Sequence, residues 1–115
     1  NGALYFTERL VIVKAWNNGE HQATGAGYGV KLSVEDRASF FDPEWETVFV
    51  TLPNGVKLEA NVKKASFWNN TCIELINKKF GEWFIDKNLA PWESGKPPTF
   101  KLTPDKNNAF VLSEI

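Results

Sequence analysis

The sequence predicts a mainly β domain: a seven-stranded open β-barrel (pseudobarrel) with two short helices. Short segments rich in β-branched and aromatic residues recur along the 115 residues and are separated by Gly, Pro and Asn, which is typical of barrels and sandwiches. The hydrophobic fraction of 43%, with nine Phe and five Trp, indicates a packed core and not disorder. A chain of this length corresponds to one domain, residues 1–115.

The first part of the chain predicts two strands and a helix. Leu4–Trp16 forms a long strand, residues 17–27 with three Gly form a loop, and Tyr28–Leu32 forms the second strand. Ser33, with Asp36 three residues later, has the pattern of a helix N-cap. The helix that follows is expected to stop near residues 42–43, an Asp-Pro pair.

The middle of the chain predicts a hairpin, another strand and a second helix. Trp45–Leu52 and Val56–Lys64 are strands joined by a turn containing Asn-Gly, the strongest short hairpin signal. Cys72–Ile76 forms a strand, and Asn77 can cap a helix that ends near Asn88.

Two C-terminal strands complete the set, Thr99–Leu102 and Ala109–Leu112, with a turn at residues 104–108. Six phenylalanines are interpreted as core, and packing is also expected for two tryptophans. These residues are Phe6, Phe49, Phe80, Phe84, Phe100 and Phe110, with Trp83 and Trp92.

The charge is close to neutral overall but unevenly distributed. The net charge is −1, whereas nucleic-acid-binding domains are usually basic. Residues 61–79 contain four lysines and one glutamate, and residues 34–46 contain five acids and one arginine. One basic and one acidic face can still steer a charged partner locally, although ordinary solvated charges remain the alternative.

The residue inventory argues against an enzyme, and no cofactor or metal site is expected. His21 is the sole histidine, so catalytic triads and multi-histidine metal sites lack support. The glycine-rich residues 25–29 lack the Gly-Lys-Ser/Thr of a phosphate loop. A metal-dependent nuclease would need clustered acids with a nearby lysine, and no Glu-x-Lys occurs anywhere in the sequence.

The segment from Lys63 to Thr71 has the chemistry of a nucleic-acid groove. Two lysines, Trp68 and two asparagines gather in a predicted loop, and surface loops often carry function. Lysines suit phosphate oxygens, asparagine amides suit base edges, and an aromatic face suits a sugar or a thymine methyl.

Two motifs in this region resemble the B3 DNA-binding domain. The run from Ser66 to Leu75 is similar to the aromatic-Trp-Asn loop and strand of plant B3 transcription factors, and Gly81 to Leu89 is similar to the helix that follows. Lys14 to Gln22, ahead of a glycine-rich stretch, resembles the B3-like effector domains of bacterial type IIE restriction endonucleases. The resemblance implies two arms in the major groove of double-stranded DNA: a first arm, Lys14–Gln22, and a second arm, Lys63–Thr71.

Roles for the two arms follow from this resemblance as hypotheses. Lysines would contact phosphates, amides and His21 would reach base edges, Glu20 would accept from a cytosine amino group, and tryptophans would pack on sugars or thymine methyls. The candidate DNA-binding residues are Lys14, Trp16, Asn17, Asn18, Glu20, His21, Gln22, Lys63, Lys64, Ser66, Trp68, Asn69, Asn70, Thr71, Lys78 and Lys79. The alternative is that Trp16 and Trp68 close the ends of the barrel and the asparagines form turns.

Two further classes and the cellular setting stay open. A carbohydrate- or protein-binding β-domain would also use Trp and Asn side chains. No membrane span is seen, and the single Cys72 suits a reducing compartment, which is the bacterial cytoplasm for an endonuclease effector domain or the nucleus for a plant factor. The chain starts at Asn1 without a methionine, so we expect a piece of a longer protein, with a nuclease domain as one possible covalent partner.

Overall fold

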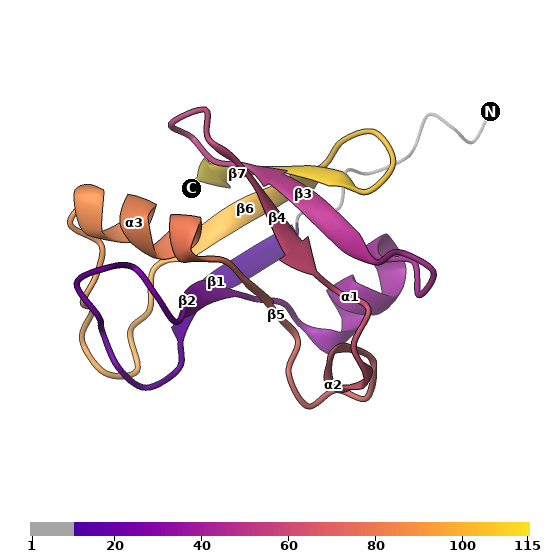
Figure 1. The fold of residues 1–115 in the computed structure, drawn as a ribbon, viewed down its shortest axis with the longest axis horizontal. Coiled ribbons are helices and arrows are strands. Elements are labelled where there is room, and N and C mark those ends of the chain that lie inside the picture. Colours follow the sequence, from indigo (N-terminus) through magenta and orange to yellow (C-terminus); the bar gives the residue numbers. More distant parts are fainter. Residues whose placement is uncertain (1–10) are drawn as a thin grey trace.

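Seven strands form one mixed sheet that is rolled nearly into a barrel (Figure 1). The computed structural model describes residues 11–115. The strands are β1 Val11–Asn17, β2 Tyr28–Lys31, β3 Thr47–Thr51, β4 Lys57–Asn61, β5 Glu74–Ile76, β6 Thr99–Pro104 and β7 Ala109–Glu114. The helices are α1 Val34–Phe40, α2 Ala65–Trp68 and α3 Lys78–Asp86. The predicted fold class is confirmed, with three helices in place of the two expected.

The strand order is β4-β3-β7-β6-β1-β2-β5, which leaves β4 and β5 as the two edges of the sheet. All neighbouring pairs are antiparallel except β3 and β7, which run parallel. Asn77 follows β5, and its amide nitrogen donates to the Glu59 carbonyl of β4 over 2.7 Å. This hydrogen bond ties the two edges together and nearly closes the barrel.

The interior of the barrel is filled by alternate residues of the strands, as expected for a sheet with one buried face. Four of the predicted core phenylalanines are buried: Phe80, Phe84, Phe100 and Phe110. Phe49 was wrongly assigned to the core. Its neighbours Val48 and Val50 point inward, so Phe49 faces outward with the Lys57 ammonium 5.1 Å from its ring centroid. Phe6 and residues 4–10 of the first predicted strand lie outside the described residues.

The predicted caps and hairpin are confirmed. The Asp36 backbone N–H donates to Ser33 Oγ at the start of α1, and the Lys79 N–H donates to Asn77 Oδ1 at the start of α3. β3 and β4 pair as a hairpin, with Gly55 at φ +88° in the turn. Left-handed φ values are accessible to glycine at little cost, which explains the Asn-Gly signal.

The segment predicted as a loop between residues 63 and 71 contains α2, so that part of the prediction was wrong. No side chain caps its first turn, and its local sequence therefore carries no helix-start signal. No helix among residues 11–115 is long and apolar enough to cross a membrane.

Candidate nucleic-acid interface

The two predicted arms are attached at opposite ends of the short β2–β5 pair. The first arm leaves β1 at Asn17, which is paired with Tyr28 at the start of β2. The second arm enters β5 at Glu74, which is paired with Lys31 at the end of β2. In Figure 1 the indigo 18–27 loop and the α2 segment both project from the lower side of the view, one on each side of β2 and β5. The fold therefore places the two arms as a pair on one side of the sheet.

Asparagines shape the first arm by forming turns. Asn17 Oδ1 accepts from the Gly19 N–H over 3.1 Å, and Asn18 Oδ1 accepts from the Glu20 N–H over 3.3 Å. A Cβ added to Gly27 would lie 2.7 Å from Asn18 Nδ2, so the loop closes tightly on this side chain. The oxygens of both asparagines thus have a structural role, as the turn alternative anticipates.

Other first-arm side chains are presented outward. Glu20 and Gln22 are exposed, and within residues 11–115 their side chains form no hydrogen bond or ion pair. Lys14 is also exposed, and Trp16 is half-buried on the outer face of β1, opposite Gly29 of β2. Of these four residues, Glu20 and Gln22 have side chains that are free to reach a base edge.

His21 connects the first arm to the barrel. Its Nδ1 lies 2.8 Å from the Tyr28 hydroxyl, and its ring meets Trp92 edge-on with centroids 4.8 Å apart. Tyr28 and Trp92 both pack on Phe84 of α3. Burial raises the pKa of the Tyr28 phenol, and the Asn17 side chain opposes that shift, so the phenol stays protonated near neutral pH. His21 has an anchoring role that leaves its other nitrogen for a ligand.

A buried arginine on α1 holds the second arm. Arg37 is 6% exposed, and its guanidinium donates to the Phe67 carbonyl and, over 2.8 Å, to Asn70 Oδ1. The guanidinium carbon also lies 4.8 Å from the Trp68 ring centroid. Asn70 adopts φ +69°, a left-handed conformation that asparagine tolerates better than most residues. These contacts fix the C-terminal end of α2.

The amide nitrogens of the second-arm asparagines remain available as donors. Asn69 and Asn70 are exposed, and their oxygens accept from the Thr71 N–H (3.0 Å) and from Arg37. Within the described residues neither amide nitrogen has a hydrogen-bond partner, so both can donate to guanine O6 and N7 or to thymine O4. A two-point contact with adenine would require the second lone pair of an amide oxygen.

The base of the second arm combines cations with an aromatic wall. Lys63, Lys64 and Trp68 line a hollow of about 230 Å³ together with Pro43 and Ala65. Trp68 Nε1 donates to the Val62 carbonyl over 3.1 Å, which orients the indole. The ring is half-buried, so Trp68 both packs on the barrel and offers a surface. Ser66 and Thr71 are joined through the Thr71 N–H and the Ser66 carbonyl, 3.1 Å apart.

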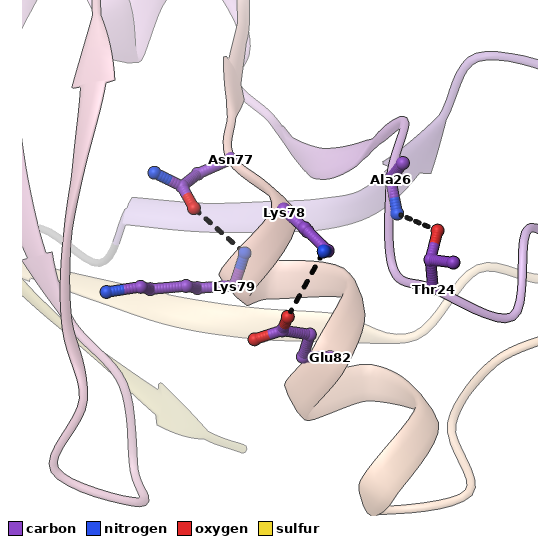
Figure 2. Close-up of polar contacts among 6 residues, drawn as sticks. All are labelled: Thr24, Ala26, Asn77, Lys78, Lys79 and Glu82. Atoms are coloured by element: carbon purple, nitrogen blue, oxygen red, sulfur yellow. Dashed lines mark hydrogen bonds and ion pairs between the residues drawn. The ribbon is translucent and has the colours of Figure 1, made fainter.

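The lysines at the start of α3 are placed differently from each other (Figure 2). Lys78 Nζ lies 3.9 Å from Glu82, beside the 24–26 loop at the base of the first arm. Lys79 points away from that loop and lines a hollow with Asn54 and Val56 of the β3–β4 hairpin. The structure therefore separates Lys79 from the two arms, although Lys79 is one of the predicted DNA-binding residues.

Arg37 positions the second arm of the candidate site but is not predicted from the sequence, where it stands as one cation within an acidic segment. The spacing of Arg37 from the predicted N-cap Ser33 indicates which face of the helix Arg37 occupies. Ser33 starts the helix, and residues three and four positions apart share a helix face, so Arg37 falls on the same face as Phe40 and Phe41. A cation on an apolar helix face is expected to reach buried carbonyl groups.

Comparisons with known proteins found one partial similarity. No family model matches the chain, and no solved structure matches it. The chain is 32% identical over 62 residues to "Decapping and exoribonuclease protein 1" of Saccharomyces cerevisiae. The match covers 54% of this chain but spans 13% of that protein's length.

Proposed function

We propose that this chain binds double-stranded DNA in a sequence-specific manner, with the two arms in the major groove, as the recognition domain of a bacterial restriction endonuclease. A plant-type B3 factor would use the same grip. The observation that carries the proposal is that two polar segments attach at opposite ends of β2 and project to the same side of the view in Figure 1.

The separation of the arms suits a major groove. From Tyr28 to Lys31 the β2 strand advances three residues, or about 10 Å at the usual rise. The major groove of B-form DNA is about 12 Å wide. Arms that start this far apart and project in the same direction can enter one groove together.

The chemistry of the arms also suits base reading. The exposed amides of Gln22, Asn69 and Asn70 and the carboxylate of Glu20 supply both donors and acceptors. The exposed Lys14 and Lys63 supply positive charge for phosphates. The anchoring by Arg37 and Tyr28 reduces the ordering cost that flexible arms would incur on binding.

The test begins with selection from random duplex DNA at low and moderate salt. Enrichment of a motif supports the proposal, and its absence at low salt contradicts it. The variant Asn69→Ser keeps an oxygen that can accept from the Thr71 N–H but removes both amide donors. It is expected to weaken binding to the selected motif by about 1–3 kcal/mol, roughly 5- to 150-fold.

A matched control makes this result specific to the second arm. Asn54 accepts from the Val56 N–H in the hairpin turn just as Asn69 accepts from the Thr71 N–H. The same change there, Asn54→Ser, is expected to leave DNA binding unchanged. Equal effects at the two sites would show that the loss at Asn69 reflects stability and not contact with DNA.

RNA binding is a second candidate, favoured by the partial similarity to a protein named as a decapping and exoribonuclease protein. Duplex RNA has a deep, narrow major groove that side chains cannot read. A protein that uses these arms in a groove should therefore prefer duplex DNA to duplex RNA of the same sequence. A preference for single-stranded or duplex RNA would favour the second candidate.

A further inference from the structure

We infer that the outer face of the sheet between the two arms carries a site for the phosphodiester backbone, formed by Lys14, Lys31 and Ser33. This inference rests on the proposed function and extends it from the arms to the sheet between them. Lys31 and Ser33 are outside the set of residues that the sequence nominates.

The register of the sheet brings the two lysines together. Lys14 of β1 is paired directly with Lys31 of β2. Their neighbours Val13, Ala15 and Val30 are buried, so both lysines point to the outer face. Like charges directly opposite each other on one face destabilise a sheet, and a bound anion would remove that repulsion.

The two lysines border a hollow. Its volume is about 260 Å³, and its lining consists of Ile12, Lys14, Lys31, Leu32 and Ser33. Ser33 Oγ accepts from the Asp36 N–H, which leaves its hydroxyl hydrogen free to donate. No carboxylate lines the hollow, and its polar side chains are two ammonium groups and one hydroxyl, a set that suits phosphate oxygens.

The charge of Lys31 is only partly balanced within the described residues. Its Nζ lies 3.9 Å from the carboxylate of Glu74, which is 4% exposed, whereas the Lys31 side chain is 54% exposed. An ammonium has three donors, so this long contact leaves others directed to solvent. Lys14 has no ion pair within residues 11–115.

The position of the hollow is the one that a DNA backbone would cross. Lys14 begins the first arm, and Lys31 is paired with Glu74 where the second arm joins β5. A duplex held by both arms would pass over this face. The site would then contribute affinity without sequence preference, because phosphates carry no sequence information.

Salt dependence tests this inference. Binding of the parent protein to a mixed-sequence DNA duplex is measured across salt concentrations, together with Lys14→Gln and Lys106→Gln. Lys106 lies in the exposed turn between β6 and β7, and Figure 1 shows this turn away from α2 and the 18–27 loop. Lys14→Gln is expected to lower the slope of log affinity against log salt by about 0.9, the value for one phosphate contact. Lys106→Gln should leave it unchanged.

Lys31 requires a second comparison, since Lys31→Gln alone would leave Glu74 without its partner. We therefore compare Glu74→Gln with the double variant Lys31→Gln/Glu74→Gln. Glu74→Gln should bind duplex DNA more tightly than the parent, and adding Lys31→Gln should lower the slope by about 0.9. The fold of each variant is checked by its melting temperature.

The outcomes separate this inference from the proposed function. If the parent binds DNA but Lys14→Gln and the double variant keep the slopes of their references, the phosphate site is wrong, together with the phosphate contact proposed for Lys14, and base reading by the two arms stands. A parent that does not bind duplex DNA overturns both.

Discussion

The sharpest prediction concerns Arg37, whose guanidinium joins α1 to the second arm. Arg37→Ala removes the donors to the Phe67 carbonyl and to Asn70 Oδ1 and the cation over the Trp68 ring. Hydrogen bonds to charged groups contribute about 1.5–3 kcal/mol each. Burying a guanidinium is costly, and within the described residues no carboxylate lies within 4 Å of it. The relief of that cost offsets part of the loss, and we expect a net destabilisation of about 2–4 kcal/mol.

A double-mutant cycle isolates the contact between the two side chains. Arg37→Ala, Asn70→Ala and the double variant are unfolded in urea, and the free energies of unfolding are compared. The expected coupling energy is about 1.5–3 kcal/mol, the value of one hydrogen bond to a charged group. The Arg37→Ala and Asn54→Ala pair is the control, since Asn54 lies in the turn of the β3–β4 hairpin and Figure 1 shows that turn away from α1.

Additivity would refute the reasoning. A coupling energy below about 0.5 kcal/mol is within the range of independent sites and would mean that Arg37 does not hold Asn70. The cycle has a functional counterpart. Arg37→Ala should reduce binding to the selected DNA motif more than binding to mixed sequence, because the misplaced amides serve base reading and not phosphate contact.

Three further outcomes are expected. Gly81→Ala should prevent stable docking of the 18–27 loop on α3, since the added Cβ would lie 2.1 Å from the Gly25 carbonyl oxygen; thermal melting measures the loss of stability. The free energy of unfolding should fall as pH rises above about 10, because the Tyr28 phenol titrates there in the unfolded chain but at higher pH in the folded one. Urea unfolding measures this free energy, and its dependence on pH should be weaker for Tyr28→Phe than for the parent. Lys63→Gln should lower the salt slope of DNA binding by about 0.9 without changing sequence preference, whereas Lys106→Gln should leave both unchanged.

Local chemistry accounts for the parts of the fold that the sequence predicts well. Ser33 and Asn77 cap their helices through contacts within three residues, and the hairpin turn is formed by neighbours in the chain. Phe49 could also have been placed correctly, because strict alternation puts it on the face opposite Val48 and Val50. The core assignment of Phe49 rests on its aromatic character and not on the two-residue period of the strand.

Long-range contacts account for what the sequence did not predict. The helix α2 has no capping side chain and is held by Arg37, thirty residues before Phe67. The opposition of Lys14 and Lys31 depends on which strands pair and in which register. A single sequence indicates that each lysine lies on a strand but not that the two are neighbours.

The near-neutral charge of the chain sets how its affinity should be distributed. The acidic residues between Glu35 and Glu46 lie on α1 and on the segment that leads to β3. This part of the chain is close to the second arm, because Arg37 of α1 contacts Phe67 and Asn70. Their field opposes a polyanion, so no general attraction compensates for the loss of one contact. A domain of this kind should bind mixed-sequence DNA weakly and with a shallow salt dependence, set by the few lysines that face the duplex. Most of its discrimination must then come from the amide donors of the arms, which makes the rigidity given by Arg37 and Tyr28 part of specificity.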